Sequence, residues 1–360
     1  MASERCPCGA YARRRNCPKC RLGEQAVSQL DADRQIARLT TQLTGTKGKY
    51  GEAMRRISAL EAERDAAIGL SRPEGSLIIR PKEKSGTNEG TIIVEASDWH
   101  AEERVEPKRI NGLNRFNLEI AEERITTFFQ GIERLTRLLQ QDIAITEMIV
   151  ALLGDFISGD IHEEVAEACE LPPMEAICWV QDRMIGGFDF LLNHTKVNLS
   201  VPCHVGNHSR TTKTSRFGSE NGHSLEYLMY RHLAAYYRSE DRIRFDIADG
   251  PHSYATVYGK ELRFQHGHMI KYNGGVGGLT IPANKAINEW NKGRKADLDL
   301  FGHFHTDFDG NNFLANGSLI GYNSFAMSIK APFDVPKQTL ILMDKKRGTR
   351  TCRWPILFKR

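Results

Sequence analysis

The chain has 360 residues, which favours two domains because a single hydrophobic core seldom grows beyond about 250 residues. Hydrophobic residues make up 40% of it and charged residues 26%, which excludes a wholly disordered, collagen-like or disulfide-framework protein. The formal net charge is +4, yet residues 1–23 hold six basic side chains against one acidic, and residues 344–360 hold seven against one. Both ends are therefore basic, and the body between them is acidic.

Neither a membrane span nor a secretory signal is expected. No stretch approaches about 18 consecutive apolar residues, and the first fifteen residues lack the apolar core of a signal peptide. We therefore expect a cytoplasmic protein. Its 8 cysteines would stay reduced in that compartment.

Residues 1–23 are expected to form a zinc-knuckle-like segment. They contain a CPC and a CPKC pair, made by Cys6, Cys8, Cys17 and Cys20. A tetrahedral structural Zn²⁺ takes four thiolates and would supply the only core that so small a segment could have. Because the spacer between the pairs is shorter than in the usual zinc ribbon, a redox pair and an unliganded tail remain alternatives. Arginines 13–15 would contact phosphate, or would simply be solvated.

Residues 24–70 follow a heptad pattern typical of a helical coiled-coil segment. The a and d positions hold Ala32, Ile36, Leu39, Leu43, Tyr50, Ala53, Ile57 and Leu60. Because Gly45, Gly48 and Gly51 interrupt the pattern, we expect two helices or a helical hairpin rather than one rod. The apolar stripe needs a partner, which is either a second copy in a homo-oligomer or the chain's own catalytic body. Residues 71–90, rich in Pro, Gly, Ser and charge, are expected to be a linker.

From residue 91 onward, apolar runs alternate with amphipathic stretches, which predicts an α/β domain over 91–360. The expected strands are 91–96, 148–153, 199–205, 244–247, 262–265, 298–301, 313–315 and 339–343. The expected helices are 116–141, 173–192, 222–238 and 280–292.

Five of these strands end in metal-ligating residue types. The sequences that follow them are Asp98-Trp99-His100, Gly154-Asp155, Gly206-Asn207-His208, His266-Gly267-His268 and Gly302-His303-Phe304-His305. Carboxylate and imidazole together suit manganese, iron or zinc better than calcium. Loops at one rim of an α/β sheet can converge on one point, so we expect a metal site there.

This series resembles the calcineurin-like metallophosphoesterase superfamily, whose signature is DxH, GDxx[DG], GNH[DE], a single His and GHxH. Over residues 91–345 the chain is most similar to phage-borne members, and more distantly to the nuclease subunits of double-strand-break repair complexes. The resemblance implies a four-layer αββα sandwich with two divalent metals, Mn²⁺ favoured over Fe²⁺ or Zn²⁺. For a phage-encoded chain, the location would be the host cytoplasm.

The resemblance also implies a role for each matching residue. The ligands of the first metal would be Asp98, His100 and His305. The second metal would take Asn207, His266 and His303, and Asp155 would bridge the two. His208 would be the catalytic acid, or would hold the phosphate, and would not be a ligand. His268 is the alternative to His266, which is favoured because family members place the ligand directly before Gly.

Three departures from the family pattern bear on the site. Ser158 stands where many members carry Asp, and Ser209 replaces the acid that follows His208, which leaves the orientation of His208 open. Arg210 would bind substrate phosphate, or would pair with an acidic neighbour. The long segment 101–145 would be a lid or a packing element.

The sequence therefore predicts a metal-dependent phosphoesterase, and the leading hypothesis is a phosphodiesterase that acts as a nuclease on DNA or RNA. The basic ends, the cysteine pairs and the heptads fit a polyanionic polymer, while the acidic body counts against one. A small-molecule phosphodiesterase acting on cyclic nucleotides, or a protein phosphatase, is the enzymatic alternative. A structural or assembly protein with a vestigial metal site is the non-enzymatic one.

Overall fold

The fold is described from a computed structural model, which covers residues 18–71, 88–272 and 278–359, with helix side chains described from 29 to 64 in the first range. The chain divides into two compact units, Met1–Glu83 and Lys84–Arg360. Among the described helices, none combines the length and the apolar character that a bilayer crossing requires.

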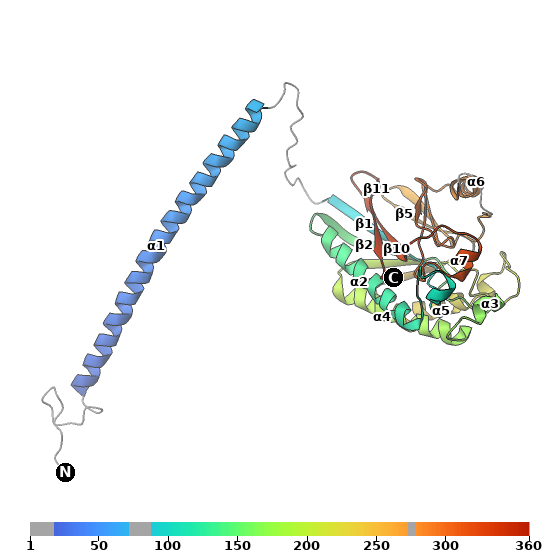
Figure 1. The fold of residues 1–360 in the computed structure, drawn as a ribbon, viewed down its shortest axis with the longest axis horizontal. Coiled ribbons are helices and arrows are strands. Elements are labelled where there is room, and N and C mark those ends of the chain that lie inside the picture. Colours follow the sequence, from blue (N-terminus) through green and yellow to red (C-terminus); the bar gives the residue numbers. More distant parts are fainter. Residues whose placement is uncertain (1–17, 72–87, 273–277, 360) are drawn as a thin grey trace, which may run out of the picture. The chain divides into compact units, whose positions relative to one another are not determined.

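The first unit contains one uninterrupted helix, α1 (Pro18–Ser71), drawn in blue in Figure 1. The prediction of two helices or a hairpin was therefore wrong. A glycine inside a helix costs only about 1 kcal/mol relative to alanine, and the residues on both sides are rich in Ala, Leu, Arg, Gln and Glu, which favour a helix. The helix also includes Cys20, whose side chain, like Cys6, Cys8 and Cys17, lies outside the described residues. The zinc-knuckle prediction is therefore not tested.

The second unit is built on two sheets. The first has the order β11-β10-β1-β2-β3-β4, in which β1 to β4 run parallel and β10 is antiparallel to both of its neighbours, β1 and β11. Its strands are β1 (Asn88–Ala96), β2 (Ile143–Leu152), β3 (Asn198–Cys203), β4 (Ile243–Ile247), β10 (Lys337–Asp344) and β11 (Thr349–Leu357). Ile93 on β1 pairs with Ile149 on one side and Ile341 on the other, which fixes the register of the sheet centre.

The second sheet has the order β5-β6-β7-β9-β8. Its strands are β5 (Ser253–Val257), β6 (Lys260–Phe264), β7 (Leu298–Phe301), β8 (Phe308–Asp309) and β9 (Phe313–Ala315). The strands β6, β7 and β9 are parallel to one another. Both sheets therefore have parallel strands at their centres, and such strands present their carboxyl ends at one edge.

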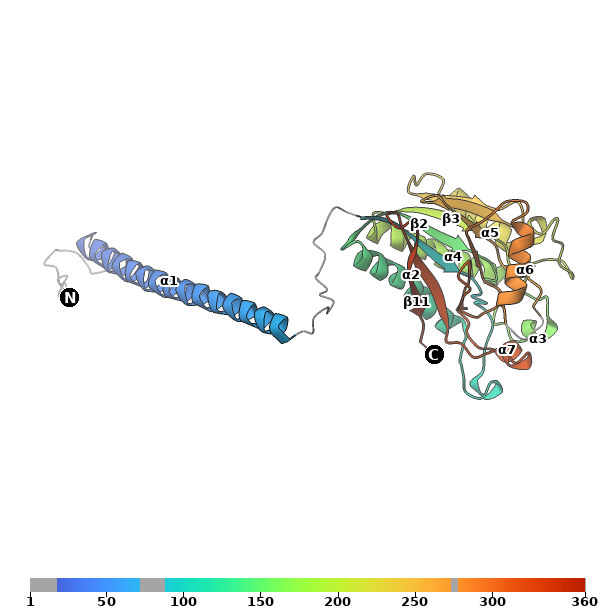
Figure 2. The same cartoon turned by 90° about the horizontal axis from the view of Figure 1, so that it is seen from above.

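Alternating side chains of the central strands separate the layers of this unit. Ile92 and Val94 pack into the core beneath the helices α2 (Leu118–Leu139), α4 (Pro173–His194) and α5 (Leu225–Tyr236). Ile93 points the other way, into a core shared with Leu262 and Leu300 of the second sheet. The helix α6 (Thr280–Trp290) contributes to a third cluster on the far face of that sheet. Figures 1 and 2 show α2 and α4 on one side of the strands and α6 on the other.

This mixed α/β architecture with two packed sheets is consistent with the predicted sandwich, and the eight predicted strands and four predicted helices all occur within a few residues of their expected positions. The prediction missed β5, β8 and β11 and the short helices α3 (Glu163–Ala166) and α7 (Ser324–Ser328). β11 and most of β5 are partly exposed, so neither carries a continuous apolar run. Of the long segment 101–145, the helix α2 is a packing element that begins at an Asn117 cap.

Candidate metal centre

The loops that follow β1, β2, β3, β6 and β7 deliver the predicted ligands to one place. Asp98, His100 and His305 form one group, in which one ligand atom from each residue lies within 4.8 Å of the others. His100 Nε2 lies 3.2 Å from His305 Nε2, and His305 Nε2 lies 3.4 Å from Asp98 Oδ1. Two imidazole nitrogens and a carboxylate oxygen thus face a common point, as a divalent transition metal requires.

A second group of the same kind contains Asp155, His266 and His303. His266 Nε2 lies 2.9 Å from Asp155 Oδ2 and 3.1 Å from Asn207 Oδ1. Asp155 also belongs to a third group, with His100 and His208. It therefore lies between the two sets of ligand atoms, at the position of a bridging carboxylate. The residues present fit two divalent cations.

The backbone is strained where it presents these side chains. Five of the predicted ligands have a positive φ, a conformation that costs a residue with a side chain about 1–3 kcal/mol. They are Asp98 (54°), His100 (45°), Asp155 (55°), His303 (70°) and His305 (50°). Such strain persists only where the surrounding structure imposes it, and it concentrates at functional sites.

The glycines that precede the ligands are required by close packing. A Cβ on Gly206 would lie 2.0 Å from Asp155 Oδ1, and a Cβ on Gly302 would lie 2.3 Å from Asp98 Oδ2. The loops after β3 and β7 therefore press their backbones directly against the two carboxylates. Only glycine allows this approach, which explains the Gly in the GNH and GHxH sequences.

Hydrogen bonds from outside the ligand set hold the imidazoles. His266 Nδ1 lies 2.6 Å from the Leu153 carbonyl, which can only accept, so Nδ1 carries the proton and Nε2 is left for a metal. His100 Nδ1 lies 2.9 Å from Ser158 Oγ, which in turn donates to Glu103 Oε2 at 3.0 Å. This His–Ser–Glu chain is buried throughout, and it assigns the Nδ1 proton of His100 in the same way.

Two further buried carboxylates hold the motif loops by their backbones. Glu226 Oε1 accepts from Phe156 N and its Oε2 from Gly206 N, both at 2.7 Å, which ties the loop after β2 to the loop after β3. Glu102 Oε1 accepts from the amides of Ser158 and Gly159. Burial raises the pKa of Glu102 to about 7, and burial together with the charge of Asp155 raises the pKa of Glu226 to about 8.

Electrostatics within the site prepare it for cations. Burial acts to raise the pKa of Asp155, but the imidazoles of His266 and His208 outweigh it and hold that pKa well below its usual range. Burial and neighbouring imidazoles hold the pKa values of His100 and His303 well below the usual value, so both are neutral at pH 7. For His266, burial lowers the pKa but the Asp155 carboxylate raises it to about 10. Without metal, His266 and Asp155 are therefore an ion pair.

His208, the predicted catalytic acid, lies at the edge of the ligand groups. Its backbone amide donates to Asp155 Oδ1 at 2.8 Å, and its Nδ1 lies 3.0 Å from the Ser158 carbonyl. That carbonyl fixes the ring with Nε2 free. Ser209, in place of the acid that family members carry, instead lies with its Oγ 2.8 Å from Ser224 Oγ. The orientation of His208 thus comes from the backbone of the loop after β2.

Arg210 and His268 lie outside the two ligand groups. The guanidinium of Arg210 donates to the carbonyls of Asn207 and Thr212, in its own loop. These hydrogen bonds explain the position of the Arg210 side chain. Neither of the predicted partners, a substrate phosphate or an acidic neighbour, is needed. His268 Nε2 lies 3.0 Å from Glu220 Oε1, while His266 is the histidine of this pair that joins Asp155 and His303.

Sequence reasoning missed the buried acids Glu102, Glu103 and Glu226. Glu102 and Glu103 follow His100 by two and three residues, so an acidic pair beside a ligand motif was an available signal. Glu226 lies in the first turn of α5, far along the chain from the loops it holds. Nothing in its local sequence distinguishes it from an ordinary helix-start acid.

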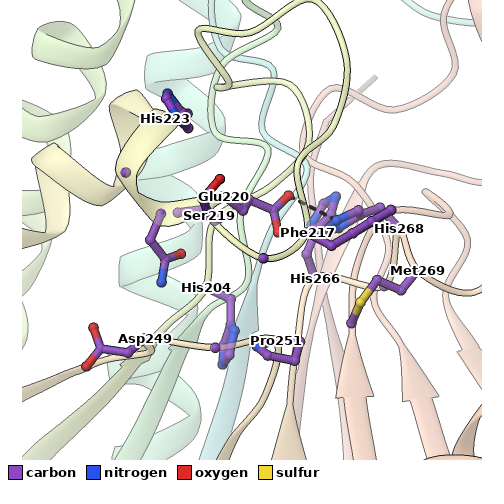
Figure 3. Close-up of a pocket in the computed structure, with 16 residues that line it drawn as sticks. His204, Phe217, Ser219, Glu220, His223, Asp249, Pro251, His266, His268 and Met269 are labelled. Carbon is purple, nitrogen blue, oxygen red and sulfur yellow. Dashed lines mark ion pairs between the residues drawn. The ribbon is translucent and has the colours of Figure 1, made fainter.

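A cavity of about 160 Å³ opens beside the second ligand group, and His266 lines it (Figure 3). Its walls also carry His204, Phe217, Glu220, Asp249 and His268. The rings of Phe217 and His268 lie nearly parallel, with centroids 5.7 Å apart and planes 10° from each other. The described lining contains carboxylates and flat rings but neither lysine nor arginine.

No family model and no curated protein matches the chain. Among solved structures, a novel archaeal phosphodiesterase aligns at 11% identity and a TM-score of 0.32, over 73% of this chain and 99% of its own. The calcineurin-like phosphoesterase YfkN from Bacillus subtilis aligns at 11% identity and a TM-score of 0.30, over 76% of this chain and 93% of its own. A novel phosphatase from Mycoplasma pneumoniae aligns at 10% identity and a TM-score of 0.28, over 75% of this chain and 92% of its own.

At TM-scores this low, none of these similarities supports an assignment of function. Such an assignment has to rest on the convergence of the ligand atoms. The sequence motifs nevertheless resemble those of calcineurin-like phosphoesterases, and one of the similar solved structures is a calcineurin-like phosphoesterase.

Proposed function

We propose that this chain is a dinuclear metal-dependent phosphoesterase of the calcineurin-like superfamily, and that it cleaves phosphodiester bonds in DNA. The observation that carries the proposal is the pair of ligand groups that meet at Asp155. Asp98, His100 and His305 would hold one cation, and Asn207, His266 and His303 the other. Imidazole and carboxylate ligands together suit Mn²⁺, Fe²⁺ or Zn²⁺ better than Ca²⁺, and the resemblance to the superfamily leads us to favour Mn²⁺.

Two such cations would activate a water molecule and neutralise the phosphate charge. The chain's own residues supply the rest. His208, held through Nδ1, presents Nε2 beside His100 and Asp155, where it can give a proton to the leaving oxygen. The strained loops keep the ligand side chains in place without rearrangement. The neutral imidazoles of His100 and His303 are available to bind a cation at pH 7.

Two features support a nucleic-acid substrate over a simple phosphate ester. Both ends of the chain are strongly basic, which favours binding to a polyanion. The cavity beside His266 offers the Phe217 ring for stacking and the Asp249 carboxylate as an acceptor, and its described lining contains neither lysine nor arginine. Amino and ring N–H groups of a nucleobase fit such a lining. The proposed location of this activity is the cytoplasm.

The test is a Mn²⁺-supplemented assay of the wild type and Asp155→Asn with linear DNA, circular single-stranded DNA and bis(p-nitrophenyl) phosphate. Cleavage of DNA by the wild type alone supports the proposal. Cleavage of the aryl ester alone would leave a small-molecule phosphodiesterase or a phosphatase. Equal activity in both proteins would indicate a contaminant, and a pure protein that binds no divalent cation would leave an assembly protein with a vestigial site.

DNA binding can be tested apart from cleavage. The affinity for DNA should fall steeply as salt rises, and most of it should be lost when residues 1–23 are deleted. Hydrolysis of bis(p-nitrophenyl) phosphate should survive that deletion. Equal DNA affinity with and without residues 1–23 would show that the basic N-terminus does not contribute to DNA binding.

A structural Zn²⁺ on Cys6, Cys8, Cys17 and Cys20 is part of the same proposal. The support is the pairing of four thiols in fifteen residues. Metal analysis of the full chain after Mn²⁺ is removed should find one Zn²⁺ per chain. The double variant Cys17→Ser/Cys20→Ser should hold none, and an unchanged zinc content would contradict the site.

A further inference from the structure

The helix α1 carries an apolar stripe that nothing within its own unit covers among the described residues. Six large side chains along it are between 47% and 68% exposed, and they are Ile36, Leu39, Leu43, Tyr50, Ile57 and Leu60. An isolated helix of this length gains little from intrinsic propensity alone and is normally stabilised by packing of its apolar face. The stripe therefore calls for a partner surface along its whole length.

The stripe keeps a strict heptad frame through the glycine-containing region. With Ile36 at an a position, the a series continues through Leu43, Tyr50 and Ile57, and the d series is Ala32, Leu39, Thr46, Ala53 and Leu60. In this frame the three glycines occupy positions c, f and b, on the side away from the seam. They cost helix propensity but leave no gap in the apolar stripe.

The hydroxyl of the threonine in the central seam is already satisfied. Thr46 Oγ1 donates to the Gln42 carbonyl at 2.8 Å, within the same helix. Its methyl group can face a partner helix while its hydroxyl stays bonded, so burial of this d position would leave no unpaired hydrogen-bond donor.

We infer that α1 forms a parallel, in-register, two-stranded coiled coil with a second copy of this chain. The residue types at the seam favour two strands. Ile36 and Ile57 are β-branched at a positions, and Leu39 and Leu60 lie at d positions, which is the combination that favours parallel dimers.

The flanking charges favour the parallel orientation. In a parallel pair, each g residue faces the e residue five positions later on the other helix. Charged residues then meet at one pair, Arg56 with Glu61 of the second copy, and symmetry repeats it. The other g–e pairs in the described part of the helix join a charged residue to a neutral one, or two neutral residues, so no like charges meet.

The antiparallel arrangement that keeps the whole seam buried is disfavoured by the same residues. Its e residues face e residues and its g residues face g residues. Lys47 and Lys49 would then each face their own counterpart, and Asp33 would face Glu61 of the other copy. Like charges would meet at these places with no attractive pair to offset them.

In a parallel dimer, the two basic N-terminal segments would adjoin one end of the coiled coil, and both catalytic units would follow from the other end. This follows from chain direction alone. Two basic segments together would bind a polyanion more tightly than one, through their higher effective concentration. The inference itself does not depend on the proposed enzymatic activity.

The first experiment measures mass and orientation on the full chain. Light scattering should give twice the chain mass of 40.6 kDa. Under mild oxidation, Ala53→Cys at a d position should yield a covalent dimer well above the wild-type background, whereas the outward-facing Ser58→Cys at position b should not. A monomer or a trimer would overturn the inference. A dimer in which Ala53→Cys fails to cross-link would overturn the parallel register, since Ala53 would then face Leu43.

The second experiment exchanges charges. Arg56→Glu and Glu61→Arg should each raise the dimer dissociation constant about tenfold, because two attractive pairs become repulsive. The double exchange should restore it. Dissociation constants unchanged by the single exchanges would contradict the pairing. An unchanged unfolding transition of the catalytic unit, measured in the full chain of all three variants, would show that their effects are confined to α1.

Discussion

The buried chain from His100 through Ser158 to Glu103 makes a quantitative prediction. In Ser158→Ala, the His100 Nδ1–H and one oxygen of Glu103 lose their shared partner, while Asn323 still donates to the other oxygen at 2.9 Å. All three residues of the chain are buried, so water does not readily replace the hydroxyl. The substitution thus removes support from a predicted ligand without touching the ligand itself.

The expected effects follow from the unpaired groups. Each of the two buried groups left without a partner costs about 1–3 kcal/mol, so the free energy of unfolding should fall by about 2–6 kcal/mol. For a domain of this size, that lowers Tm by roughly 4–15 °C. Loss of an outer hydrogen bond typically costs a metal ligand about 10–100-fold in metal affinity. Mn²⁺ binding should weaken by that factor.

The assay pairs calorimetric Mn²⁺ titration with thermal unfolding of the metal-free protein. Ser209→Ala is the matched control, because Ser209 is equally buried on the same rim but bonds Ser224 rather than an imidazole. It should lose stability and keep its Mn²⁺ affinity. If both variants bind Mn²⁺ equally well, or if Ser209→Ala is the weaker binder, the relay through Ser158 does not position His100.

Three other predictions follow. His208→Gln should lower kcat about 10²–10⁴-fold with Mn²⁺ stoichiometry unchanged, and loss of the metal instead would make His208 a ligand. The pKa of His266, raised to about 10, means that metal must displace a proton, so Mn²⁺ affinity should rise with pH between 6 and 8, and a flat profile in calorimetry would contradict this. Phe217→Ala should raise KM for DNA but not for bis(p-nitrophenyl) phosphate. Equal changes in KM for both substrates would show that the cavity does not bind a base.

Much of the fold could be predicted because its signals are local. Parallel central strands are buried on both faces, so they appear as continuous apolar runs such as Met148–Leu153, and the amphipathic helices between them keep a 3.6-residue period. β11 escaped prediction because it lies at a sheet edge and is partly exposed. The single helix α1 was mispredicted because three glycines in seven residues are locally unfavourable to a helix, whereas a long favourable run tolerates them.

The identities of the candidate ligands were determined by the sequence alone. Asp, His and Asn at the ends of five strands can be recognised without coordinates, because parallel strands deliver their carboxyl ends to one edge. The tertiary structure decided what surrounds them: that Glu226 ties two loops together, that Ser158 connects His100 to Glu103, and that Arg210 binds its own loop. These contacts join residues whose partners depend on how loops pack. A short, polar, irregular segment carries no periodic signal, so only the folded chain determines which atoms it meets.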